Sequence, residues 1–225
     1  MDFDINKVIK LIIGNKDNLL FPIKKEAQVC DALVSTIRSL YPKYRVTVEV
    51  DVKLNLEIWN NSRSARIDIV VDDNNGNFIP IEVKFKKQGI NKATDEGKFH
   101  FFYDLYRIEY LKQLNCIPNT VLKNFVSGYS IMFTNNKDYL TDKNKKNANK
   151  PINEQNIDCY FNICPEAKQI VKGKEYDWNR KSDSKGTFNK KSYNILKPFV
   201  YKQSYDLEWH QFIGDFQYLA LKTKR

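Results

Sequence analysis

The sequence predicts an α/β fold in which helices flank a central β-sheet. Three observations lead to this prediction. An amphipathic helical pattern occupies 24–42, and strand-like segments rich in valine and isoleucine follow between 44 and 86. A long aromatic-rich helical segment then precedes another apolar strand at 124–135. With 225 residues, the chain is predicted to form one domain, 1–225, with a large core.

The first helix is predicted over 24–42 and ends at Pro42. Four residues follow the i, i+4, i+7, i+11 spacing of one helix face, and they are Glu26, Cys30, Leu33 and Ile37. A glutamate on an inward stripe is unusual, because glutamate is seldom buried without a partner. A glutamate in a first helical turn is also favoured by the helix dipole alone. Both interpretations of Glu26 stay open.

Three strands are predicted next. Segment 44–58 alternates polar and apolar residues, which predicts a strand or a hairpin arm. Its Glu49 and Asp51 are within reach of a site on the neighbouring strands, but charged residues are also common on edge strands. The segments ARIDIVVDD and FIPIEVKFKK form the other two strands. Carboxylates within such apolar strands need a partner or a metal.

The turn between the last two strands decides whether their acidic residues meet. Glu82 and Lys84 share one face, because side chains alternate along a strand. A loop of three or five residues centred on Asn75 places Asp68 opposite Glu82. The favoured two-residue turn opposes Asp68 to Val83 and divides the acids between the two faces. A shared site therefore requires the odd-numbered loop, with the following glycine in a left-handed conformation.

Asp68, Glu82 and Lys84 form a small set of groups suited to metal-assisted cleavage of a phosphodiester. Two carboxylates hold a hard divalent cation such as Mg²⁺ or Mn²⁺. The lysine orients the attacking water or stabilises the developing charge. The alternative is a solvent-side aspartate and an ordinary charged pair on a half-exposed strand.

This arrangement resembles the PD-(D/E)xK nuclease superfamily, the fold of many restriction endonucleases and of archaeal junction resolvases. In that family a helix precedes a mixed sheet, an aspartate lies on the second strand, and (D/E)-x-K lies on the third. Here RIDIVV supplies Asp68, and IEVKFK supplies Glu82 and Lys84. Ile67 replaces the proline that precedes the aspartate, a mild departure because that proline carries no metal chemistry. The resemblance covers about 20–135.

The resemblance implies the fold, the site and the reaction. The fold would be restriction-endonuclease-like, with a mixed central β-sheet flanked by helices and a β-rich C-terminal extension at 192–225. Asp68, Glu82, the carbonyl of Val83 and a third acidic residue, Glu26, would bind Mg²⁺ or Mn²⁺, and Lys84 would complete the catalytic set. The implied enzyme cuts DNA in restriction or another defence, with repair or recombination as the competing context. Double-strand cutting by two active sites leads us to expect a homodimer.

The net charge of +10 suits a protein that binds a polyanion, although a bias toward Lys, Asn and Ile can also come from mutation alone. Basic loops are predicted at 136–157 and 172–191, either to grip phosphates or as solvated loops without a role. Tyr176 and Trp178 are candidates to stack on a base. The predicted nucleic-acid-binding residues are Lys143, Lys145, Lys146, Lys172, Lys174, Arg180, Lys181 and Lys185. The sequence does not distinguish DNA from RNA.

The remaining segments are a helix predicted over 94–115, strands at 193–201 and 216–222, and a short helix between those strands.

The four cysteines lack zinc-finger spacing, which predicts reduced thiols and a cytoplasmic location. No segment is long and apolar enough for a membrane span, which predicts no membrane partner. Two alternatives to an enzyme stay open. One is an inactive nuclease-like module that binds nucleic acid, and the other is a basic structural or partner-binding protein in which the hairpin is incidental.

Overall fold

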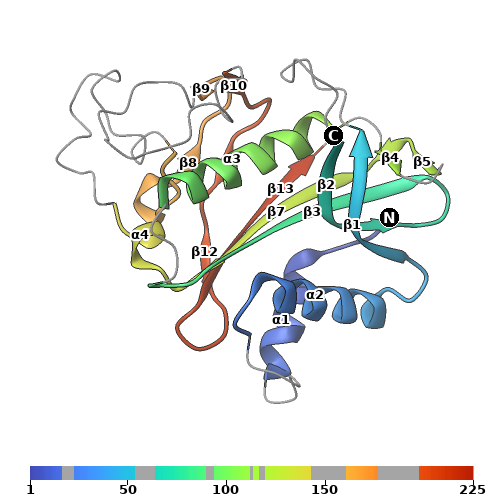
Figure 1. The fold of residues 1–225 in the computed structure, drawn as a ribbon, viewed down its shortest axis with the longest axis horizontal. Helices are drawn as coiled ribbons and strands as arrows, with labels where there is room; N and C mark the ends of the chain where they lie inside the picture. The colour runs from blue at the N-terminus through green and yellow to red at the C-terminus, as the bar shows by residue number, and fades with distance from the viewer. Residues whose placement is uncertain are drawn as a thin grey trace.

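A mixed, nine-stranded β-sheet forms the centre of the molecule, and helices cover both of its faces (Figure 1). The computed structural model describes residues 1–16, 23–53, 64–89, 94–111, 114–116, 120–142, 161–176 and 198–224. The strand order is β12-β13-β7-β3-β2-β1-β4-β5, and β6 (Asn124–Phe125) pairs with β3 outside this path. The predicted α/β class with a mixed central sheet is confirmed.

Three neighbouring strands form an antiparallel meander, consisting of β1 (Arg45–Lys53), β2 (Ser64–Asp72) and β3 (Asn77–Lys86). β1 lies within the strand predicted over 44–58, and residues 54–63 lie outside the described part of the chain. The apolar residues of β3 are buried from Phe78 to Phe85, as expected for a central strand.

A helical crossover joins this meander to the rest of the sheet. Helix α3 (Thr94–Tyr110) follows β3, and β7 (Ser127–Thr134) then runs parallel to β3. The C-terminal strand β13 (Gln217–Lys224) pairs antiparallel with β7 along its whole length, and β12 (Trp209–Gln211) pairs with β13. The C-terminal strand therefore belongs to the same sheet as the meander.

Two helices, α1 (Ile5–Gly14) and α2 (Glu26–Leu40), cover one face of the sheet. Asp4 caps α1, since its Oδ1 accepts a hydrogen bond from the Asn6 amide at 2.9 Å. The helix predicted over 24–42 is confirmed as α2. Among helices in the described residues, none combines the length and apolar character that crossing a membrane requires. The buried stripe of α1 consists of Ile5, Val8, Ile9 and Ile12.

Helix α3 lies on the opposite face, between the sheet and the C-terminal part of the chain (Figure 1). Toward the sheet it packs so closely that only glycine fits at position 128, because a Cβ there would lie 2.2 Å from Cγ2 of Ile108. On the outer side, the Phe102 ring lies 5.3 Å from the ring of Phe161 and 5.0 Å from that of Tyr176. The aromatic residues on all sides of α3 are thus explained by burial on two sides.

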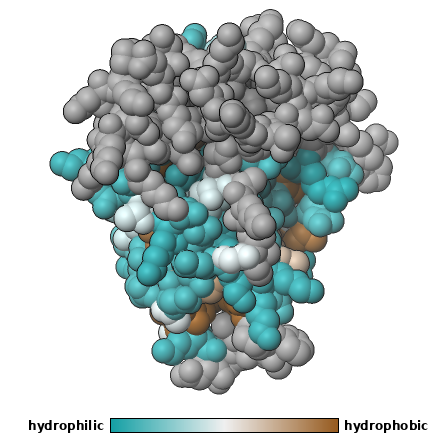
Figure 2. Space-filling model, turned by 60° about the vertical axis from the view of Figure 1, so that its left-hand side comes forward, coloured by the Kyte–Doolittle hydropathy of each residue, from teal (hydrophilic) through white to brown (hydrophobic). Residues whose placement is uncertain are grey.

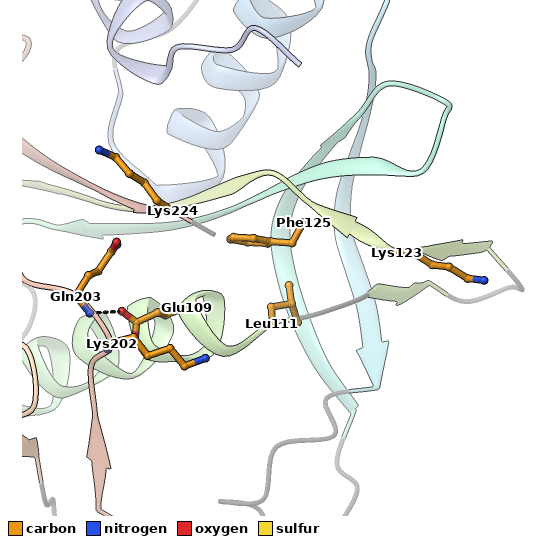
Figure 3. Close-up of a pocket in the computed structure, with 7 residues that line it drawn as sticks. All are labelled: Glu109, Leu111, Lys123, Phe125, Lys202, Gln203 and Lys224. Carbon is orange, nitrogen blue, oxygen red and sulfur yellow. Dashed lines mark hydrogen bonds between the residues drawn. The ribbon is translucent and has the colours of Figure 1, made fainter.

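A buried carboxylate near the end of α3 holds the C-terminal segment. Glu109 is 9% exposed and accepts hydrogen bonds from the amides of Lys202 at 2.8 Å and Gln203 at 3.2 Å (Figure 3). The Tyr205 hydroxyl donates a third bond at 2.8 Å. The remaining short elements are helix α4 (Lys137–Leu140), a 3-10 turn at Pro165–Ala167 and two strand pairs. These pairs are β8 (Gln169–Ile170) with β11 (Tyr205–Asp206), and β9 (Glu175–Tyr176) with β10 (Phe199–Val200).

Two predictions of secondary structure are wrong. The helix predicted over 94–115 ends at Tyr110, and Leu114–Cys116 instead form β4, which pairs with β1 and with β5 (Thr120–Leu122). Helical periodicity does not reveal that the edge of β1 accepts another strand. The short helix predicted in the C-terminal segment is replaced by β11 and β12, because a turn with Gly214 at φ 63° brings β12 back against β13.

The close packing of α3 on β7 predicts that Gly128→Ala lowers the free energy of unfolding by roughly 1–3 kcal/mol, the usual cost of overpacking a core. Gly14→Ala is the matched control, because a Cβ at Gly14 meets nothing within 4 Å at the end of α1. That change should be neutral or stabilising by up to about 1 kcal/mol. Urea denaturation measures both values, and equal effects would contradict the packing argument.

Candidate functional site

The candidate site lies where β2 separates from β3. The two strands pair from Asp72↔Phe78 to Ile69↔Ile81, while β2 continues beside β1 as far as Lys53↔Ser64. The last residues of β3 therefore have β7 on one side and no paired strand on the other within the described residues. Their amides on that open side need other acceptors, since buried N–H groups are nearly always hydrogen-bonded. We call this opening the fork.

The register of the hairpin confirms the odd-numbered loop. Five residues, 73–77, lie between the paired Asp72 and Phe78 and are centred on Asn75. Gly76 has φ 85°, the left-handed conformation that the prediction required. Continuing the register by one residue beyond the last pair places Asp68 opposite Glu82.

Asp68 takes the place of a strand partner at the fork. Its Oδ2 accepts a hydrogen bond from the Val83 amide at 2.7 Å. Val83 is fully buried, so this amide has no access to water. The carboxylate that the sequence predicted to lie beside the third strand is held there by the backbone of that strand.

Glu26 reaches the same edge of β3 from the first turn of α2. Its Oε2 accepts a hydrogen bond from the Phe85 amide at 2.9 Å. The amides of Lys24 and Lys25, directly before the helix, donate to Gln28 Oε1 at 2.7 Å and 3.1 Å. Glu26 therefore faces inward, as one of its two interpretations required, and the helix dipole alone does not account for its position.

Three oxygen-bearing groups follow one another along the fork. The Asp68 carboxylate lies at the Val83 amide, and the Glu26 carboxylate lies at the Phe85 amide. The Val83 carbonyl leaves the strand on the same side as these amides, because the N–H and C=O of a residue point toward the same neighbour. Lys84 Nζ lies 3.3 Å from that carbonyl oxygen. Carboxylate and carbonyl oxygens are the ligands that Mg²⁺ and other hard cations prefer.

Glu82 and Lys84, on one face of β3, are joined through Asp104 and Arg107 of α3 in a ring of four charges, of which Lys84 and Arg107 are half-buried. Arg107 Nη2 donates to Glu82 Oε1 at 2.5 Å and to Asp104 Oδ1 at 2.7 Å. Asp104 Oδ2 lies 2.7 Å from Lys84 Nζ. Glu82 is 2% exposed and Asp104 is 4% exposed. The carboxylate of Glu82 thus contacts Arg107, and in the described part of the chain no three His, Cys, Asp or Glu side chains are grouped closely enough to hold a metal ion as they stand.

Burial and the neighbouring charges shift the pKa values of the residues in the ring. Burial raises the pKa of Glu82 well above its usual value, and the carboxylates of Asp104 and Asp68 add to this effect against the opposing Arg107. Burial alone would lower the pKa of Lys84, but Asp104, Glu82 and Asp68 raise it above its ordinary value. Lys84 is therefore a cation at neutral pH, a hydrogen-bond donor and charge stabiliser instead of a general base.

Sequence reasoning missed Asp104 and Arg107. A signal was present, because these charges lie three residues apart on a helix whose other positions are mostly aromatic or aliphatic. Buried aspartate and arginine are rare unless they are paired. A charged pair among the aromatic residues of this helix therefore points toward charged partners elsewhere in the core.

A further cation at the fork is Lys86, on the same face of β3 as Glu82 and Lys84. Burial lowers the pKa of Lys86, while the charge of Glu26 opposes that shift. Lys24 and Lys25 are exposed directly before Glu26. Lysines therefore lie around the acidic groups of the fork. Sequence reasoning did not predict these lysines as nucleic-acid-binding residues, because it assigned that role to the loops.

Glu49 and Asp51, which the sequence left as weaker candidates, are exposed on β1. Both pair with Arg66, at 3.5 Å and 3.4 Å. Surface ion pairs of this kind contribute little to stability. Their contacts do not connect them with Asp68 or Glu26.

The predicted nucleic-acid-binding residues are only partly placed. Lys172 and Lys174 are exposed on the segment that joins β8 to β9. Tyr176 is 2% exposed, so its predicted role in stacking on a base is wrong, because its ring belongs to the aromatic core around Phe102. The other residues of this prediction lie outside the described residues, namely Lys143, Lys145, Lys146, Trp178, Arg180, Lys181 and Lys185.

Two other features are the hydropathy of the surface and a cavity at the end of α3. The described atoms visible in Figure 2 are mostly hydrophilic, with hydrophobic residues scattered among them. A cavity of about 580 Å³ opens at the C-terminal end of α3, beside Glu109 and Phe125 (Figure 3). Lys123 and Lys224 line it, but their ammonium groups point away from Glu109 in Figure 3. Lysines near a helix C-terminus also offset the dipole of that helix.

Comparisons with protein-family models, with curated proteins and with solved structures found no match for this chain. Its function therefore has to be inferred from its own residues.

Cys30 offers a chemical test of the fork. It lies one turn after Glu26, and burial followed by the charges of Asp68 and Glu26 raises the pKa of its thiol to about 12. At pH 8 only about one thiol in 10⁴ is then ionised, so alkylation by iodoacetamide should be slow and should accelerate as pH rises. Asp68→Asn removes one of these charges and should increase the alkylation rate several-fold.

The rate is measured by peptide-resolved mass spectrometry, with the buried Cys164 as an internal reference. Asp51→Asn is the matched control, because it removes an exposed carboxylate from the neighbouring strand. An unchanged Cys30 rate in Asp68→Asn, or an equal increase in Asp51→Asn, would show that the thiol does not sense the fork.

Proposed function

We propose that this protein is a nuclease of the PD-(D/E)xK type that hydrolyses DNA phosphodiester bonds with Mg²⁺ or Mn²⁺. The observation that carries the proposal is the fork. It brings Asp68, the Val83 carbonyl and Glu26 to one edge of β3, with Lys84 Nζ beside the same carbonyl. These are four of the five groups that the resemblance implied, with Glu82 the fifth, and they come from three separate elements.

The order of elements supports the same proposal. A helix, three antiparallel strands and a second helix follow one another as α2-β1-β2-β3-α3, and after the short strands β4–β6 comes β7, which runs parallel to β3. Asp68 lies on the second strand and Glu82-Val83-Lys84 on the third. A restriction-endonuclease-like core with a C-terminal extension is the fold that we infer from this order. Fold resemblance alone does not establish an activity, so the argument depends on the site.

The donor set fits a hard divalent cation. Asp68, Glu26 and the Val83 carbonyl would hold it, together with Glu82, whose carboxylate Arg107 now contacts. When bound, the metal would polarise the phosphate and lower the pKa of a bound water. Lys84 is a cation, and its role would be to orient that water and to stabilise negative charge on the phosphate. Lys86, Lys24 and Lys25 would bind neighbouring phosphates.

The biological setting is part of the proposal. Cutting of foreign DNA in the cytoplasm, as in restriction, is the context that the resemblance favours. Cleavage of both strands would use two copies of the site, which a homodimer supplies. The net charge of +10 supports a nucleic acid as the partner.

Cleavage assays with matched variants test the activity. Wild-type protein should cut long unmethylated phage DNA and supercoiled plasmid in Mg²⁺ or Mn²⁺ but not in EDTA. Asp68→Asn and Lys84→Met should each lower the cleavage rate by roughly 10²-fold or more, because each removes a group that stabilises the transition state. Their DNA affinity should change only a few-fold, since phosphate contacts elsewhere supply most of it.

Asp51→Asn serves as the control, because it removes an exposed carboxylate one strand away from the fork. Cleavage at the wild-type rate by Asp68→Asn or by Lys84→Met would contradict the assignment of the site. Salt-dependent DNA binding without any cutting by the wild-type protein would support an inactive binding module.

A further inference from the structure

Resting on the proposed nuclease activity, we propose that Asp104 is the positioning residue of Lys84. In this view helix α3 contributes to the site through an aspartate that holds the reactive ammonium in place, and Arg107 braces that aspartate from the other side.

The geometry places Asp104 between two cations. Its Oδ2 lies 2.7 Å from Lys84 Nζ, and its Oδ1 accepts from Arg107 Nη2 at 2.7 Å. Both oxygens of one carboxylate are thus committed, one to β3 and one to its own helix. Lys84 Nζ also lies 3.3 Å from the Val83 carbonyl, which is one of the oxygens of the fork. Asp104 therefore holds the ammonium against the group that would bind the metal.

Lys84 needs such a partner because its ammonium is carried on a flexible four-carbon stem. An ammonium that moves freely would spend little time beside the scissile phosphate, and a displacement of about 1 Å can cost a large factor in rate. The surroundings of Lys84 are tight, with its side chain 18% exposed and the side chain of Asp104 6% exposed. The Asp104 carboxylate is the anion in contact with it.

Arg107 ties the aspartate to Glu82. A single nitrogen, Nη2, contacts both carboxylates, so the positions of Glu82 and Asp104 are linked. The Nε of Arg107 is buried and has no hydrogen-bond partner among the described residues. The guanidinium is thus oriented toward the two acids through Nη2, and its Nε takes no part in these contacts.

Stability alone gives little reason for this ring. Replacing a buried group of ion pairs by apolar residues is often neutral or stabilising, because taking charges out of water is costly. The rest of α3 shows that this core accommodates aromatic and aliphatic residues readily. A charged ring in contact with the acid-x-lysine strand is therefore better explained by the chemistry of that strand.

The test compares three variants under steady-state conditions. Asp104→Asn keeps the size of the side chain but removes its charge, and it should lower kcat by roughly 10–100-fold, the usual effect of losing a residue that orients a site group. The KM for DNA should stay within about twofold, because Lys84 acts on the reacting phosphate. Asp104→Glu restores the charge and should give a kcat between those of Asp104→Asn and the wild type.

Glu109→Gln is the matched control. It neutralises another buried carboxylate of the same helix, whose partners are two amides and a tyrosine hydroxyl in the C-terminal segment. All rates are measured at a temperature at which circular dichroism shows every variant folded. Glu109→Gln should lose thermal stability yet keep kcat within a few-fold of the wild type.

Several outcomes would overturn the inference while leaving the proposed function intact. These are a wild-type kcat in Asp104→Asn, a change confined to KM, or an equal fall in kcat in Glu109→Gln. Should Asp104→Asn fail to fold, Asp104→Glu carries the test alone, and a wild-type kcat in that variant overturns the inference. A wild-type protein that cuts no DNA in Mg²⁺ or Mn²⁺ overturns the proposed function and this inference with it.

Discussion

The open edge of β3 is the constraint on which the candidate site depends. On one side, β7 pairs with this strand from Ile81 to Lys86. On the other side, β2 pairs only as far as Ile81 and then leaves with β1. The amides of Val83 and Phe85 are buried and must be satisfied, and the carboxylates of Asp68 and Glu26 satisfy them. The sheet itself therefore fixes the two acids, and their place in the fold is inseparable from their place in the proposed chemistry.

The charges around the fork balance in a way that fits the proposal. Glu82, Arg107, Asp104 and Lys84 alternate in sign and sum to zero, so the ring offsets its own burial. Asp68 and Glu26 lie outside the ring, at the amides of Val83 and Phe85, and they leave two negative charges along the fork. A divalent cation would neutralise them. Burial first, and then the charges of Asp104 and Asp68, raise the pKa of Glu82, so a cation is a more suitable addition here than another acid.

The pattern of residues within single strands and helices predicted more about this site than about the surrounding strands. Alternation along the hairpin reduced the register to two options, and the loop centred on Asn75 is the one that places Asp68 opposite Glu82. The stripe of α2 offered an inward Glu26 as one of two interpretations, and its bond to the Phe85 amide agrees with that one. The edge pairing of β4 and the strands β11 and β12 could not be predicted, since each depends on a partner distant in sequence. Arg107 and Asp104 were missed for the same reason, because their partners lie on β3.

Helix α3 shows how the partners of a buried acid indicate its role. Asp104 and Glu109 lie on the same helix and are almost equally buried. Glu109 accepts hydrogen bonds from neutral donors of one distant segment, which is what holding that segment in place requires. Asp104 instead contacts two cations, one of which belongs to the acid-x-lysine strand. A carboxylate that served only packing would gain nothing from confining a lysine at the edge of the fork. The difference in partners, and not the burial, distinguishes the acid that we assign to the chemistry from the one that holds the fold.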